Sequence, residues 1–161
     1  MAGYIKFDGI DGEVQDKDHK NWTEIESFSL GIHKPTVSGA TGSSRRRGDE
    51  EVSDMSVTKL VDKTSPKLEE ACCNGKVFPK VTIHCTASYT DGGRVTYLAY
   101  ELEHVQVTSY NINGHAQSEQ VPGEQLSLNF EKFKVTYTEN DEKGKKKGNV
   151  EMTWNNMEGK K

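Results

Sequence analysis

The sequence predicts an all-β domain, a β-barrel of two packed and mostly antiparallel sheets with one short flanking α-helix. In about eight segments, apolar and polar residues alternate with the two-residue repeat of a half-buried strand. A single segment, residues 65–75, carries helical signals instead. The chain has 161 residues, so we expect one domain spanning residues 1–161.

The predicted strands follow one another with turn residues between them. Apolar and polar residues alternate most regularly in residues 81–89. Asp91, Gly92 and Gly93 then predict the turn of a hairpin. Within residues 126–137 the apolar positions change from even-numbered to odd-numbered residues, which predicts a bulge. The expected strands are residues 4–7, 22–32, 52–61, 81–89, 95–102, 104–110, 126–137 and 150–154.

The expected helix covers residues 66–74. Ser65 is placed to cap it, Pro66 suits its first turn, and Gly75 suits a left-handed C-cap. Leu68 and Ala71 fall on one face of such a helix, so this face is predicted to pack on the barrel wall.

Charge and composition exclude several classes of function. The 21 basic and 25 acidic residues leave a net charge of −4, which gives no overall attraction to nucleic acid or anionic lipid. No stretch approaches the ~20 apolar residues of a membrane-spanning helix. The N-terminus has no apolar signal region, so we expect no cleaved signal peptide. Three cysteines, two of them adjacent, do not form a disulfide framework.

Two polar segments interrupt the strand pattern. Residues 34–51 form a predicted extended loop, and long loops in compact domains are usually functional or disordered. The Lys143–Lys147 cluster predicts a solvated hairpin tip. Phosphate binding by the arginines of the loop is disfavoured, because acidic residues follow at once and no aromatic residues interleave. The charged residues at the end of the loop are Arg45, Arg46, Arg47, Asp49, Glu50 and Glu51.

No pattern of residues predicts catalysis, a cofactor or a metal site. The chain has no Gly-x-Ser-x-Gly elbow, no Cys-x-x-Cys pair and no His-x-x-x-His pair. The acidic residues between Asp8 and Asp18 do not have the spacing of an EF-hand loop. We therefore expect a protein that is not an enzyme.

Several blocks together resemble the haemolysin-coregulated (Hcp) tube family of type VI secretion. The blocks occur in the order of that family and span nearly the whole chain. Leu30 stands where the family usually has an aromatic residue. The most specific block leads from a strand into the helix. The blocks are residues 4–13, 19–25, 27–31, 57–68, 126–130 and 154–155.

The resemblance implies a subunit of hexameric rings that stack into a tube. A contractile sheath would surround the tube, a VgrG-like spike protein would tip it, and small effector proteins would travel in its lumen. Ser29 matches a small lumen-facing position of the family, and the loop with Arg45, Arg46, Arg47, Asp49, Glu50 and Glu51 is expected to contact the next ring. The protein would be cytoplasmic before firing and then secreted. The alternative is a monomeric β-barrel that binds a ligand or belongs to a toxin of such a system.

Overall fold

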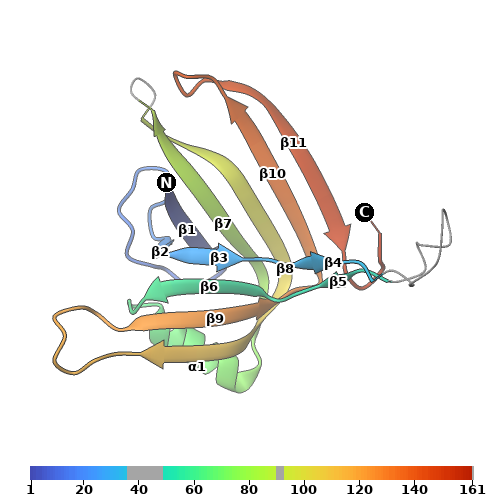
Figure 1. Ribbon diagram of the computed structural model, residues 1–161. Helices are drawn as coiled ribbons and strands as arrows, with labels where there is room; N and C mark the ends of the chain where they lie inside the picture. The colour runs from blue at the N-terminus through green and yellow to red at the C-terminus, as the bar shows by residue number, and fades with distance from the viewer. Residues whose placement is uncertain (36–48, 90–92, 161) are drawn as a thin grey trace.

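A curled antiparallel sheet dominates the computed structural model, which describes residues 1–35, 49–89 and 93–160 (Figure 1). One short helix, α1 (Ser65–Asn74), lies beneath the sheet. The strands are β1 (Ala2–Phe7), β2 (Thr23–Ile25), β3 (Ser27–Ser29), β4 (Ile32–His33), β5 (Glu51–Val52), β6 (Met55–Leu60), β7 (Val77–Tyr89), β8 (Gly93–Asn113), β9 (Gly123–Asn129), β10 (Lys132–Asn140) and β11 (Lys146–Asn155). The predicted fold class is confirmed.

The main sheet curls into a barrel that its strand ladders do not fully close. Its order is β2-β1-β7-β8-β9-β6-β3, with β10 paired to β8 and β11 paired to β10. The two ends of this path, β2 and β3, are consecutive in the chain and are separated only by Glu26. The backbone N–H of Glu26 donates to the carbonyl of Thr58. Among the described residues, no ladder joins β2 to β6 or β3 to β1.

Strand β8 is the central strand of the sheet and pairs with three others. It pairs with β7 along one edge, and with β10 and then β9 along the other. The sequence predicted two strands here, but the chain runs through His104 as one strand, with a φ of 51° at that residue. The parity change predicted as a bulge is instead the break between β9 and β10 at Phe130 and Glu131.

The core lies on the inner face of the curled sheet. Residues paired across antiparallel strands share a face, so each row of the register is a row of the core. One row runs from Phe7 through Val81, Leu102 and Phe133 to Trp154. The first four of these are buried, and Trp154 packs against them from the edge.

Helix α1 adds its apolar face to this core. Leu68 and Ala71 are buried, as predicted. Gly75 closes the helix with a φ of 70°, and its N–H donates to the carbonyl of Ala71. The cap at the other end was predicted wrongly: Thr64 is the N-cap, without a side-chain cap bond, and Ser65 accepts from the Asp62 N–H instead.

Candidate functional site

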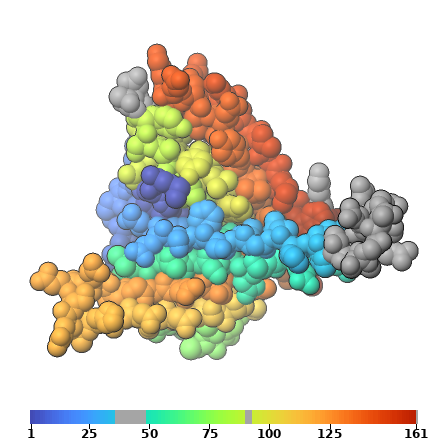
Figure 2. Space-filling view, in the orientation of Figure 1, coloured from blue at the N-terminus to red at the C-terminus, as the bar shows by residue number. Residues whose placement is uncertain are grey.

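The serine predicted to face a lumen lies on an exposed polar face of the sheet. Ser29 ends β3, which pairs with β6, and its side chain is exposed. Figure 2 shows β3, β6 and β9 as successive bands across one side of the molecule. Because side chains alternate along strands, every second residue of these bands faces outward.

Two register rows make up this polar face. The first contains Ser29, Ser56, Ser127 and Ser109. The second contains Ser27, Thr58, Gln125 and Asn111. We call these eight residues the hydroxyl face. None of them is charged, although 29% of the chain is.

Local contacts hold the hydroxyl face in place. Ser27 and Thr58 share a hydrogen bond of 2.6 Å between their hydroxyl oxygens. At the border, Thr108 and Asn129 both donate to the carboxylate of Asp54. The opposite side of the same strands is core, where Met55, Val57, Leu126 and Leu128 are buried. The face therefore offers hydrogen-bonding groups on a rigid support and carries no charge of its own.

The predicted charged loop is only partly within the described residues. Arg45, Arg46 and Arg47 lie outside them. Glu51 begins β5, which pairs with β4, and is exposed like Asp49. Glu50 accepts a hydrogen bond of 3.2 Å from the Trp154 indole N–H, so the end of the loop is fixed to the end of β11.

A buried ion-pair network beneath the sheet was missed by the sequence reasoning. Lys59 is completely buried on β6, and its Nζ lies 2.6 Å from a carboxylate oxygen of Glu124 on β9. The same Nζ donates to Asp62 at 3.0 Å and to the hydroxyl of Ser65 at 3.3 Å. Tyr110 donates to the other oxygen of Glu124, and burial together with that carboxylate raises the pKa of Tyr110 well above its usual value. The network joins three strands to the start of α1.

A second polar cluster fixes the loop between β1 and β2. His19 is buried, and its Nε2 lies 3.0 Å from Nδ1 of His84 while its Nδ1 lies 3.0 Å from Asp16. The ring of Tyr4 stacks on His19 at 4.5 Å, and Trp22 lies 4.6 Å from His84. Burial, and then the neighbouring His19, lower the pKa of His84 to about 4. This cluster links the loop between β1 and β2 to His84 on β7.

The described residues contain no group of three or more His, Cys, Asp or Glu side chains suited to holding a metal ion. Within the same ranges, no helix has the length and apolar character needed to cross a membrane. The three cysteines are free: Cys85 is buried, Cys72 is half-buried and Cys73 is exposed.

Comparisons with known proteins show the family of the chain. The family model described as "Type VI secretion system effector, Hcp" matches residues 4–137. Protein hcp1 of Pseudomonas aeruginosa is 30% identical over 153 residues, which cover 94% of this chain and 93% of that protein.

Solved structures repeat the same fold. One type six secretion system protein, 29% identical, superposes with a TM-score of 0.90 over 99% of this chain and 98% of that one. Hcp1 from Salmonella typhimurium, 23% identical, gives a TM-score of 0.76 over 99% of this chain and 97% of that one, and supports the fold alone. The chain therefore belongs to the Hcp family of type VI secretion tube proteins.

Proposed function

We propose that the chain forms hexameric rings, and that these rings stack into the inner tube of a type VI secretion machine. Residues 1–161 act as one domain in this role, which is structural and transporting rather than catalytic. Contraction of a surrounding sheath propels the tube, which carries a VgrG-like spike protein at its tip. The hydroxyl face is the observation that carries the proposal, because a rigid, uncharged and hydrated wall suits the lining of a protein-conducting tube.

The lumen is the place where small effector proteins are carried. Ser29 and its row of serines present hydroxyl groups that hydrogen-bond either to water or to a polar protein surface. The absence of charge within the eight residues avoids strong attraction to cargo of either sign. Cargo is therefore held by many weak contacts, which release it after export.

The cargo contact is tested by replacing Ser29 with Gln. The longer side chain occupies the lumen, so we expect less effector to co-purify while the ring keeps its size. Ser118→Gln is the matched control, because Ser118 is exposed in the connection between β8 and β9, away from the hydroxyl face. Unchanged cargo binding in Ser29→Gln would remove the lumen assignment.

Ring stacking is assigned to the charged end of the extended loop. Asp49 and Glu51 are exposed, and Glu50 is fixed by Trp154, so the acidic residues are presented at the same end as the C-terminus. Exposed ion pairs contribute about 0.2–1 kcal/mol each, which gives stacking that depends on salt. Replacing Arg45, Arg46 and Arg47 with Ser is expected to weaken ring stacking and to leave the rings intact. Tubes that persist in this variant would refute the stacking role of the arginines.

The first experiment is mass by light scattering combined with negative-stain images of the same peak. Six copies in an open ring support the proposal. The alternative function, a monomeric β-barrel that binds a ligand or serves a toxin, predicts one copy at high concentration. Such a monomer would gain thermal stability when its ligand is added.

A further inference from the structure

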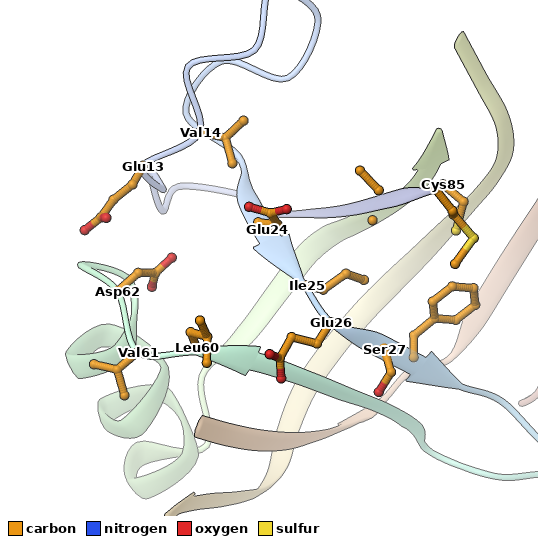
Figure 3. A pocket seen from close by; sticks show the side chains of 14 residues that line it. Glu13, Val14, Glu24, Ile25, Glu26, Ser27, Leu60, Val61, Asp62 and Cys85 are labelled. Carbon is orange, nitrogen blue, oxygen red and sulfur yellow. The ribbon is translucent and has the colours of Figure 1, made fainter. Parts of the chain in front are cut away.

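A hollow of about 720 Å³ opens beside β2 and β3, between the start of β1 and residues 60–62. Its apolar lining includes Gly3, Ile25 and Cys85. Its other side is acidic, and Figure 3 shows the carboxylates of Glu24 and Glu26 pointing away from Ile25, with Cys85 on the opposite side. The remaining acidic lining residues are Glu13 and Asp62.

Two of the four acidic side chains lack a partner in the described part of the chain. Asp62 is paired with the buried Lys59 at 3.0 Å, and Glu13 accepts from the backbone N–H of Lys63 at 2.9 Å. Glu24 and Glu26 are exposed, and no cation of the described residues lies within ion-pair distance of either. The hollow thus combines an apolar floor with uncompensated negative charge.

The β10–β11 hairpin, which we call the arm, rises beside the long strands β7 and β8, above β3, β6 and β9 (Figure 1). Its register places Tyr137 opposite Val150 and Val135 opposite Met152, on the same face as the buried Phe133. Exposure on this face rises toward the tip, from 37% at Met152 through 50% at Tyr137 to 72% at Val150. The core face of the sheet therefore continues along the arm as an uncovered apolar strip.

The tip of the arm, residues 139–147, carries four lysines and the three acidic residues Glu139, Asp141 and Glu142, which gives it a net charge of +1. Asp141 accepts from the backbone N–H groups of Lys143 and Lys145 and so fixes the turn. Lys147 lies 3.9 Å from Glu139 on the same arm. Lys143, Lys145 and Lys146 are exposed, and within the described ranges no carboxylate pairs with them. Among the described residues, the apolar strip and the unpaired Lys145 and Lys146 of the arm therefore complement the apolar floor and the unpaired acids of the hollow.

We propose that the arm of one subunit docks into the hollow of the next subunit of the ring. The apolar strip covers the floor around Ile25, and Lys145 and Lys146 lie against Glu24 and Glu26. This contact rests on the hexameric ring proposed above and names the two surfaces that close it.

Strand pairing holds the tip of the arm away from the hollow of its own subunit (Figure 1). Strand β10 is paired with β8 through six residues, and β8 with β7, whose Cys85 lines the hollow, so one strand separates the arm from this lining. Neighbouring strands are about 4.8 Å apart, and folding the arm back would break these ladders. Arm and hollow are different surfaces of the subunit, so a contact between them across two subunits is heterologous. Contacts of this kind propagate around a ring and close it.

Charge reversal tests the pairing. A hollow variant, Glu24→Lys with Glu26→Lys, puts lysines opposite lysines, and an arm variant, Lys145→Glu with Lys146→Glu, puts acids opposite acids. Each alone is expected to weaken subunit association about tenfold or more, because two attractive pairs become repulsive. In a mixture, the two variants can alternate around the ring. Each basic arm then meets an acidic hollow and each acidic arm meets a basic hollow, so six-membered rings should return.

The outcomes separate this contact from the ring itself. A wild-type chain that stays monomeric would refute both the ring and the contact. Wild-type rings that persist in both variants at 0.15 M salt, or folded variants whose mixture fails to form rings, would refute the contact and leave the ring standing. Circular dichroism checks that each variant is folded. The control is Lys67→Glu with Glu70→Lys on exposed positions of α1, which should keep its rings.

The apolar half of the contact has its own test. Val150→Ser removes an exposed side chain, so the isolated subunit should keep its stability while ring association weakens at every salt concentration. Val121→Ser is matched to it, because Val121 is 52% exposed in the connection between β8 and β9. Equal ring yields for the two variants would show that Val150 does not enter the hollow.

Discussion

Lys59 is the residue whose replacement should destabilise the subunit most sharply. It is completely buried, and Glu124, its nearest partner, is 3% exposed. Replacing Lys59 with Met keeps most of the side-chain volume but leaves the Glu124 carboxylate buried without a counter-charge. Asp62 and Ser65 also lose a donor.

The cost follows from the burial of that carboxylate. Breaking a buried ion pair by removing one partner costs about 3–5 kcal/mol, whereas an exposed pair contributes less than about 1 kcal/mol. In a domain of this size, 1 kcal/mol shifts the melting temperature by roughly 2–4 °C. We therefore expect Lys59→Met to melt roughly 6–20 °C below the wild type.

A double variant distinguishes the charge from general damage to the core. Lys59→Met with Glu124→Gln removes both charges, and the amide oxygen still accepts from Tyr110. Most of the lost stability should return. Urea unfolding followed by tryptophan fluorescence measures this at one fixed protein concentration, because ring formation would otherwise add stability. A loss below about 1 kcal/mol in the single variant, or a double variant no better than the single, would refute the reasoning.

Two further predictions concern the loop over β1 and β7. The pKa of His84 is about 4 in the folded chain and about 6.5 when unfolded, so the unfolded state binds more protons between these values. Stability should fall as pH drops from 6.5 to 4, by on the order of 1–2 kcal/mol after allowance for partial exposure, and His84→Gln should flatten the profile of unfolding free energy against pH. In Gly12→Ala, a Cβ would lie 2.3 Å from the carbonyl oxygen of Trp22, so this variant should lose stability in thermal melts, whereas Gly123→Ala meets nothing within 4 Å and should not.

Local patterns in the sequence predicted the local structure well. The alternation in residues 81–89 identified β7, and Gly75 closed the helix where expected, because both signals depend on neighbouring residues. The segment 22–32 was predicted as one strand but is divided into β2, β3 and β4. The division arises because β2 pairs with β1 while β3 pairs with β6. These partners are distant in the sequence, so the local pattern of residues 22–32 does not reveal the break.

The surfaces proposed to be functional depend on pairing between distant segments, which the sequence does not display. The position of Ser29 came from the family resemblance, but its row with Ser56 and Ser127 exists only through the β3–β6–β9 ladders. The buried Lys59 did leave a signal: it occupies the inward position of the alternation begun by Met55 and Val57. A lysine at an inward position predicts a buried partner.

The hydroxyl face and the arm differ in how much apolar surface assembly could bury. The hydroxyl face consists of polar side chains, so covering it would gain little apolar burial. The arm is different, because Tyr137, Val150 and Met152 continue the core face without a cover. Burying a side chain of this kind contributes about 1.5–3 kcal/mol when complete. In the proposed ring, assembly through the arm would bury the apolar strip and leave the hydroxyl face open to line the lumen.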